Sequence, residues 1–117
     1  MIVITGVTGF IGAQILNHCL NDADIADNYQ IRGTARNPMD AVKMQPLNDW
    51  FGGAEALAEK ADIVHLDLLD DNSIDEAIAG ASYVIHSANP VGINEPNDPA
   101  EMIRPSVDGT LSVMRAA

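Results

Sequence analysis

The sequence predicts an α/β fold, a doubly wound parallel sheet of four strands in the order 3-2-1-4 with helices on both faces. Short apolar and β-branched runs alternate along the chain with segments of helical periodicity. This alternation is typical of βαβ units, whose right-handed crossovers fix the strand order. A glycine-rich turn, TGVTGFIG, joins the first strand to the first helix. The 117 residues suffice for one domain, so residues 1–117 are expected to form a single unit.

The first half of the chain contains two predicted strands and three predicted helices. In order, they are a strand over 1–5, a helix over 11–20, a strand over 29–35 and short helices over 40–47 and 54–60. The strands are apolar and rich in β-branched residues, and the first helix carries an apolar stripe. The polar stretch NDADIADN interrupts this stripe. Gly52 and Gly53 separate the two short helices.

The second half repeats the alternation. Predicted here are a strand over 62–66, a helix from Ser73, a strand over 82–87 and a last helix whose apolar stripe contains Ile103, Val107, Leu111 and Met114. Ser73-x-x-Glu76 is typical of a capping box, and Gly80 is expected to end that helix. Pro105 is placed near the start of the last helix, where its missing N–H costs least.

Composition and charge argue against several classes of partner. The formal net charge is −11, and the six Lys and Arg residues are scattered, so neither nucleic acid nor an anionic membrane surface is an expected partner. No apolar run approaches the roughly 20 residues of a membrane helix. Cys19, the only cysteine, is expected to be a core residue rather than a nucleophile. A lone thiol and the lack of a leader peptide predict a cytoplasmic location.

The spacing of the glycines predicts a phosphate-binding turn. Gly6, Gly9 and Gly12 are three residues apart between a strand and a helix. In such a turn the first glycine permits a tight bend, the second permits close approach of a pyrophosphate, and the third lets the helix pack on the strand. The N–H groups of Phe10 and Ile11 are expected to contact phosphate at the helix N-terminus. A side chain at Gly9 is also expected to strain the turn through a positive φ. The alternative is an ordinary glycine-rich turn.

The pattern TGxxGxxG resembles the N-terminal motif of the extended short-chain dehydrogenase/reductase family, the NAD-dependent epimerase/dehydratase superfamily. The stretches IRGTARNP, LDLLDD, YVIHSANPV and IRPSVDGTLSVMRAA resemble, in the same order, the dihydroflavonol reductase and cinnamoyl-CoA reductase branch. The resemblance covers essentially the whole chain. It implies a Rossmann-like domain that binds NAD(P) and serves reduction of a carbonyl substrate.

The second strand predicts which dinucleotide is bound. An NAD site usually has Asp or Glu at the end of this strand, to hold the ribose 2′-hydroxyl. Here the sequence is RGTAR, with Arg36 at the strand end and Lys43 seven residues later. Arg36 can bind a 2′-phosphate, and the resemblance implies the same role for both cations. NADP is therefore expected, with NAD possible. The alternative is that both are solvated surface cations.

The resemblance assigns the remaining cofactor contacts. It implies that Asp67 and Leu68 border the adenine, with Asp67 accepting from the amino group. The alternative for Asp67 is a turn residue. It implies that Ser87 and Ala88 lie on the nicotinamide side, and Asn89 is a weaker candidate because the branch often lacks asparagine there.

No catalytic or metal-ligating set is identified in the chain. The family's chemistry uses a Tyr-x-x-x-Lys helix, with Tyr as the general acid, and neither Tyr29 nor Tyr83 is followed by lysine at that spacing. In the family this motif, like the substrate-binding part, comes later than the segments matched here. His18, His65 and His86 lack metal-ligand spacing and are interpreted as structural.

Three hypotheses remain open. In the first, the chain is the NADP(H)-binding portion of a carbonyl reductase, with a small-molecule carbonyl substrate only in a full-length parent. In the second, it is a non-catalytic dinucleotide-binding module that acts as a sensor or interaction protein. In the third, it is a fragment with little activity of its own. In all three the strand 82–87 is an apolar sheet edge without Lys or Pro. Such an edge templates pairing with another chain, so self-association is expected through it or through the helix faces beside it.

Overall fold

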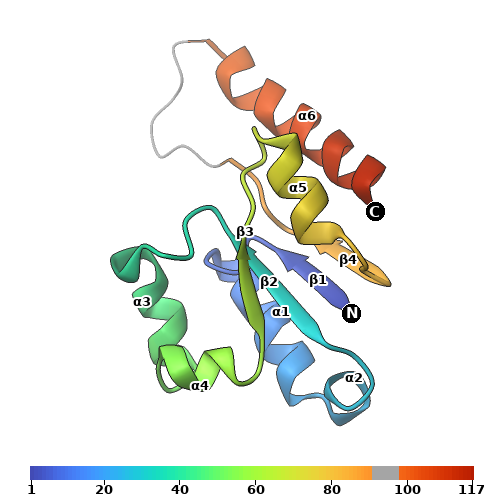
Figure 1. Cartoon of the computed structure of the whole chain (residues 1–117). Helices are drawn as coiled ribbons and strands as arrows, with labels where there is room; N and C mark the ends of the chain where they lie inside the picture. The colour runs from blue at the N-terminus through green and yellow to red at the C-terminus, as the bar shows by residue number, and fades with distance from the viewer. Residues whose placement is uncertain (91–97) are drawn as a thin grey trace.

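In the computed structural model, which describes residues 1–90 and 98–117, the chain forms a parallel sheet in the order β3-β2-β1-β4 (Figure 1). Its strands are β1 (Ile2–Thr5), β2 (Ile31–Ala35), β3 (Asp62–His65) and β4 (Tyr83–His86). In the central strand Ile4 pairs with Gly33 on one side and with Ile85 on the other. The predicted strand order is confirmed, and all four strands point their carboxyl ends to one edge of the sheet.

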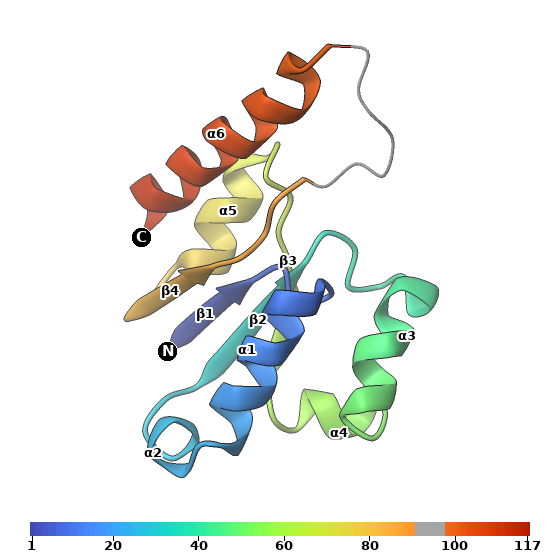
Figure 2. The same ribbon diagram turned by 180° about the vertical axis from the view of Figure 1, so that it is seen from behind.

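Helices cover both faces of the sheet, as predicted. The described helices are α1 (Phe10–Asn21), α2 (Ala23–Ala26), α3 (Ala41–Trp50), α4 (Ala54–Ala58), α5 (Asp71–Ile78) and α6 (Ala100–Ala116). Helices α5 and α6 pack on one face, while α1, α3 and α4 pack on the other, as Figures 1 and 2 show from opposite sides. None of the helices in the described part of the chain is both long and apolar enough to cross a membrane.

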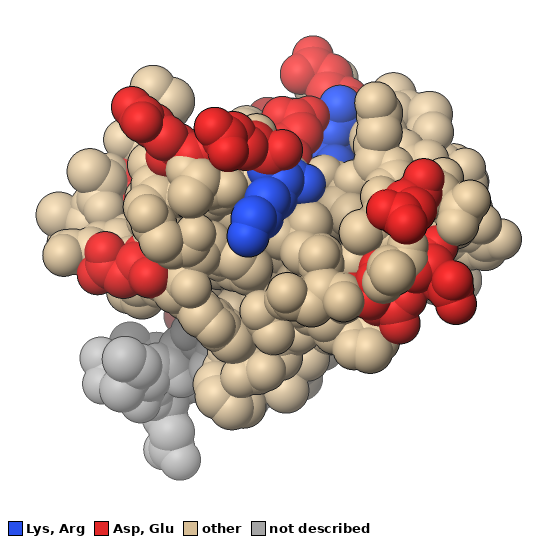
Figure 3. Space-filling view, turned by 90° about the horizontal axis from the view of Figure 1, so that it is seen from below, with Lys and Arg blue, Asp and Glu red and all other residues tan. Residues whose placement is uncertain are grey.

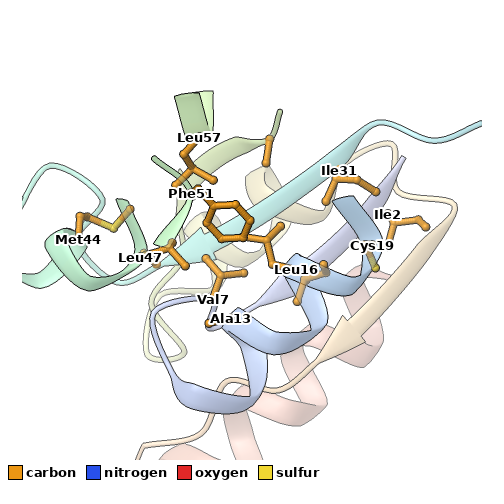
Figure 4. Close-up of a cluster of buried hydrophobic side chains, with 13 residues drawn as sticks. Ile2, Val7, Ala13, Leu16, Cys19, Ile31, Met44, Leu47, Phe51 and Leu57 are labelled. Atoms are coloured by element: carbon orange, nitrogen blue, oxygen red, sulfur yellow. The ribbon is translucent and has the colours of Figure 1, made fainter. Parts of the chain in front are cut away.

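Two hydrophobic clusters hold these layers together. The larger contains Ile4, Val7, Leu16 and Leu57 among its buried residues and joins the sheet to α1, α3 and α4 (Figure 4). The smaller joins Val3 to α5 and α6. Alternate residues of a strand point to opposite faces, so β1 supplies Ile2 and Ile4 to one cluster and Val3 to the other, and it is buried along its whole length. This explains why MIVIT reads as a continuous apolar run rather than an alternating one.

Cys19 lies in the larger cluster and is buried. Burial, with a smaller contribution from the Asp22 carboxylate, raises the pKa of its thiol. The thiol therefore stays protonated at neutral pH, which suits the core role expected from the sequence.

The helices differ from the sequence prediction in three places. The polar stretch after α1 contains the short helix α2, capped by Asp22, whose side chain accepts from Ile25 N–H. Helix α3 continues to Trp50, beyond the predicted end, although it contains Pro46. The predicted capping box at Ser73 is wrong, because the N-cap of α5 is Asp70, whose carboxylate accepts from Asn72 N–H.

Ser73 instead lies inside α5, where it is buried. Its hydroxyl donates to Asp70 O at 2.8 Å and accepts from Asp67 N–H at 2.9 Å. The segment DLLDDNS offers several residues that can cap a helix, and only packing of the loop selects one. The predicted end of α5 is confirmed at Gly80, which follows the cap residue with φ of 79°.

Helix α6 differs from its predicted form in two respects. Pro105 is inside the helix, in its second turn, rather than at its start. The stripe of Ile103, Val107, Leu111 and Met114 is exposed, and the buried residues of this helix are Gly109 and Val113. The cause is close packing, because a Cβ at Gly109 would lie 2.8 Å from Leu68 Cβ. A small residue, rather than the most apolar face, therefore meets the rest of the protein.

Candidate functional site

A cavity of about 510 Å³ lies at the carboxyl edge of the sheet. Its lining comes from the segments that follow all four strands: Gly6, Thr8, Gly9, Phe10, Ile11, Gly12, Thr34, Arg36, Lys43, Leu66, Leu68, Ser87, Ala88 and Asn89. In an open parallel sheet this edge is where ligands bind, at the point where the connections leave to opposite faces. The cavity brings together every site residue predicted above except Asp67. It also includes Thr8, Thr34 and Leu66, which sequence reasoning missed.

Gly6 forms the tight bend after β1. Its φ is 73°, a conformation that favours glycine, and a Cβ there would lie 2.8 Å from Ala88 Cα. Its N–H donates to Thr34 Oγ1 at 3.3 Å, and the next N–H, of Val7, donates to Thr34 O at 3.0 Å. The buried Thr34 thus ties the glycine turn to β2. The parallel sheet places the end of β2 beside the end of β1. This proximity is the feature from which Thr34 could have been predicted as a site residue.

Gly9 is the N-cap of α1, and one expectation about it is wrong. Its φ is −83°, so no positive φ is required there. A Cβ at Gly9 would meet only Gly6 O, at 3.3 Å. The first hydrogen bond of the helix joins Ala13 N–H to Gly9 O. The N–H groups of Phe10 and Ile11 precede that bond and are left to face the cavity, at the positive end of the helix dipole.

Gly12 permits the closest contact in the turn. A Cβ at this position would overlap Gly6 O and would lie 2.8 Å from Gly6 C and 3.0 Å from Ser87 Oγ. Helix α1 therefore crosses the end of β1 with backbone against backbone. This is the packing role that the sequence pattern assigned to the third glycine.

Two cations line the same cavity from the end of β2 and the start of α3. Arg36 is exposed, and within residues 1–90 and 98–117 its guanidinium pairs with no carboxylate. Lys43 lies in the first turn of α3, with Nζ 3.8 Å from Asp40 Oδ2. An ion pair this exposed is weak. Both cations are therefore accessible to an anionic group in the cavity.

Neighbouring residues hold Arg36, which directly follows β2, and set it apart from Arg32 within that strand. The His65 ring lies 2.7 Å from Arg36 O through Nδ1, which donates to this carbonyl. Arg32, by contrast, pairs with Asp62 at 3.0 Å and donates to Ala77 O. Arg32 is therefore a structural residue at the far end of the strand, and only Arg36 belongs to the site.

The side chains of Asp67 and Leu68 have different surroundings in the structure. Leu68 lines the cavity, held in place by the close approach of Gly109. Asp67 is not among the lining residues, and its carboxylate accepts from Leu69 N–H at 3.0 Å. This bond is the turn role that was the alternative for Asp67, and contact with a base stays a prediction.

The residues after β4 form the opposite wall. Ser87 Oγ donates to Thr5 O at 2.6 Å, which fixes this segment to the end of β1. Ala88 lies against Gly6, and Asn89 also lines the cavity. The wall is therefore built mainly from backbone and small side chains, which leaves room for a flat ligand.

The protein as a whole is acidic, with a formal net charge of −11. Figure 3 shows the end of the molecule at which the strands begin, away from the cavity, and on this face acidic side chains are spread widely and basic ones are few. No cluster of metal-ligating side chains occurs within the described residues. A cavity with cations at one end is therefore unusual on this protein, and it favours a negatively charged organic ligand over a cation.

A glycine-rich turn at the start of a helix, in a four-stranded 3-2-1-4 sheet, defines a Rossmann-like dinucleotide-binding protein. The sequence model of the NAD dependent epimerase/dehydratase family matches residues 2–117, and the chain belongs to this family. The resemblance noted in the sequence is thus confirmed. The chain is 36% identical over 115 residues to dihydroflavonol 4-reductase of Hordeum vulgare, and 36% identical over 117 residues to cinnamoyl-CoA reductase 1 of Petunia hybrida.

These matches cover 98% and 100% of the chain but 30% and 31% of the relatives. The chain thus spans about a third of the length of these curated relatives. Among solved structures, an NADPH-bound carbonyl reductase from chicken fatty liver superposes with a TM-score of 0.73 at 20% identity, over 98% of this chain and 45% of the other. At that identity the likeness shows the fold alone.

Proposed function

We propose that this chain is the NADP(H)-binding portion of a carbonyl reductase or dehydrogenase of its family. The observation that carries the proposal is the charge of the cavity. Arg36 and Lys43 line it, while no Asp or Glu occurs among its described lining residues. A ribose 2′-hydroxyl calls for a carboxylate acceptor, whereas a 2′-phosphate calls for cations.

The geometry supports a definite placement of the dinucleotide. The pyrophosphate lies against Gly9 and the N–H groups of Phe10 and Ile11, and the 2′-phosphate lies between Arg36 and Lys43. The adenine lies against Leu66 and Leu68, since both are apolar lining residues near the end of β3. The nicotinamide lies beside Ser87 and Ala88, on the other side of the glycine turn.

The cofactor supplies hydride chemistry, and the chain supplies binding and orientation. Reduction of a carbonyl also requires a proton for the oxygen, which the family obtains from a Tyr-x-x-x-Lys helix. No such motif occurs in these 117 residues. We therefore place the carbonyl substrate and the proton donor in a longer parent protein, which works in the cytoplasm if the lone cysteine reflects a reducing compartment.

The test is dinucleotide binding by the chain with Gly9→Val as the comparison. Wild type is expected to bind NADPH more tightly than NADH in a calorimetric titration. The branched side chain of Gly9→Val occupies the phosphate position, so binding of both dinucleotides is expected to fall below detection while circular dichroism still shows the fold. Full affinity in Gly9→Val would contradict a phosphate-binding role for this turn.

A non-catalytic dinucleotide-binding or sensor module is the second candidate, favoured by the lack of a Tyr-x-x-x-Lys motif in the sequence. Both candidates predict cofactor binding. They differ in the full reading frame of the gene, where a downstream Tyr-x-x-x-Lys supports the reductase and its absence supports the module. Turnover of NADPH with a panel of aldehydes and ketones by the 117-residue chain would contradict the assignment of the proton donor to a longer parent.

Self-association of this chain is expected through β4 and α6. In the described sheet β4 is an edge strand, and α6 exposes an apolar stripe of Ile103, Val107, Leu111 and Met114. We propose that a second copy covers these surfaces, since an open apolar edge templates pairing. Light scattering across a dilution series should show a concentration-dependent mass. Val107→Glu with Leu111→Glu should shift it toward monomer, and a wild-type monomer at high concentration would contradict the proposal.

A further inference from the structure

We propose that His86 is a positioning residue of the dinucleotide site: as a neutral imidazole with its proton on Nε2, it holds the Ser87–Ala88 wall in the form that receives the cofactor. The expected effect of His86 on cofactor binding rests on the proposed function. The protonation state of His86 and the hydrogen bonds of Ser87 and Ala88 can be tested without any dinucleotide.

The hydrogen bonds of Thr5 determine the tautomer of His86. Thr5 Oγ1 accepts the N–H groups of Ser87 and Ala88, each at 3.1 Å. A hydroxyl oxygen has two lone pairs and one hydrogen. Both lone pairs are therefore occupied, and the hydrogen is left to donate to His86 Nδ1, which lies 2.8 Å away. Nδ1 must accept, so the ring proton resides on Nε2.

The second ring nitrogen completes the chain of bonds. His86 Nε2 lies 3.3 Å from Thr110 Oγ1 on α6, to which it donates. Thr5 and His86 are register partners in β1 and β4, and both lie on the face covered by α5 and α6. The network thus connects a helix on the outer face of the sheet to the backbone that lines the cavity.

The wall that these bonds fix has little freedom to adjust. Ala88 approaches the bend at Gly6 so closely that a Cβ there would be 2.8 Å from Ala88 Cα. Ser87 Oγ, which donates to Thr5 O, lies against Gly12. A shift of Ser87 and Ala88 therefore changes the shape of the cavity beside the glycine turn, where the nicotinamide end of the cofactor is placed.

Protonation of His86 would break this arrangement. A charged imidazole donates through both nitrogens, and Nδ1–H would face a Thr5 oxygen whose lone pairs already accept from Ser87 and Ala88. One of the two hydrogen bonds that Thr5 Oγ1 accepts from the Ser87 and Ala88 amides must then be lost. Burial lowers the pKa of His86 below its usual value of 6.5, which keeps the ring neutral at neutral pH.

The surrounding elements bring little charge to His86. The α6 residues one turn to either side of Thr110 are uncharged: Ser106, Val107, Val113 and Met114. The charged residues of α5 and α6 are all exposed: Asp71, Asp75, Glu76, Glu101, Arg104, Asp108 and Arg115. Asp67, in the connection before α5, directs its carboxylate to Leu69 N–H. Because no carboxylate among residues 1–90 and 98–117 is placed to stabilise the imidazolium, the folded state favours the neutral ring.

Three variants separate the role of His86 from that of a packing residue. His86→Asn keeps an acceptor, Oδ1, at the position of Nδ1 but cannot be protonated. His86→Phe keeps the ring volume and loses the acceptor. Thr5→Val keeps the shape of Thr5 and loses the oxygen that accepts from the wall. His18→Gln is the matched control, since it removes the imidazole of an exposed histidine on α1, outside the site.

The first measurement is made on the unliganded chain. A long-range ¹H–¹⁵N NMR spectrum should show His86 as the Nε2–H tautomer at neutral pH. The protection of the Ser87 and Ala88 amides from exchange, measured relative to the intrinsic exchange rate at the same pH, should decrease as the pH falls below 6.5. In His86→Phe and Thr5→Val this protection should be lower than in wild type at every pH. A Nδ1–H tautomer at neutral pH would overturn the inference, whatever the chain binds.

The second measurement is NADPH affinity against pH. His86→Phe and Thr5→Val should each weaken binding about tenfold at neutral pH, as expected for one lost hydrogen bond. In the wild type and in His18→Gln the affinity for NADPH should fall as the pH drops below 6.5. His86→Asn should keep most of its affinity for NADPH and should lose the pH dependence that protonation of His86 causes. Equal affinity and equal pH dependence in all variants would overturn the inference. Absence of binding by wild type at every pH would instead contradict the proposed function, and the exchange data would still decide the role of His86.

Discussion

Replacing Gly12 by alanine is expected to destabilise the fold strongly. The added Cβ would overlap Gly6 O and come within 2.8 Å of Gly6 C. Both belong to the backbone of a bend that is itself tied to β2 through Thr34, so neither can move aside cheaply. Overpacking of this kind costs about 3 kcal/mol or more. That is a large share of the roughly 5–15 kcal/mol by which small domains are stable.

Urea unfolding followed by circular dichroism measures this effect. The matched control is Gly9→Ala, in the same turn. Gly9 has φ of −83°, and a Cβ there would meet only Gly6 O at 3.3 Å. The urea midpoint of Gly9→Ala should therefore stay close to that of wild type. If Gly12→Ala unfolds at the same urea concentration as Gly9→Ala, then α1 does not cross β1 as closely as the structure shows.

Replacing Arg36 by alanine is expected to remove most of the preference for NADPH. A hydrogen bond between charged groups contributes about 1–3 kcal/mol, so NADPH affinity should fall by roughly tenfold to a hundredfold. NADH has no 2′-phosphate and should lose little. Lys43→Ala should act in the same direction with a smaller effect, because Lys43 also has Asp40 beside it. Calorimetric titration of both dinucleotides checks the prediction.

Arg32→Ala is the matched control for this experiment, since it removes the arginine of β2, four residues before Arg36. Arg32 is engaged by Asp62 and Ala77 O, so its loss should lower stability without changing the ratio of the two affinities. Exposed cations are also screened by salt, and the preference of wild type for NADPH should therefore shrink at high ionic strength. An equal loss of NADH and NADPH affinity in Arg36→Ala would show that Arg36 does not contact the 2′-phosphate.

The elements that sequence reasoning predicted well depend on local patterns. The strand–turn–helix around Gly6, Gly9 and Gly12 has its signal within twelve residues, and the apolar run of β1 reflects burial on both faces. The position of Arg36 at the cavity was predictable for a similar reason, since the carboxyl ends of parallel strands meet at one edge of the sheet. Its accessibility, and the pairing of Arg32, depend on neighbours distant in sequence.

The elements that were missed depend on competition between equally suitable residues. Asp70 and Ser73 both suit a helix N-cap, and the loop from β3 selects Asp70 because Ser73 Oγ is used inside. The apolar stripe of α6 has the stronger amphipathic signal, yet Gly109 packs because only a small residue fits against Leu68. Periodicity ranks faces by hydrophobicity and carries no information on how close a neighbour lies.

The sequence by itself determined the order of the strands, the glycine turn and the family, because each follows from residues near one another in the chain. Only the tertiary structure decided which residues of separate strands share hydrogen bonds. Thr5 and His86 are 81 residues apart and meet at 2.8 Å, and Thr34 reaches Gly6 from β2. Parallel pairing fixes such partners through register, and register is a property of the assembled sheet. The walls of the cavity therefore follow from the fold, while the groups that we propose to contact phosphate can be read from the chain.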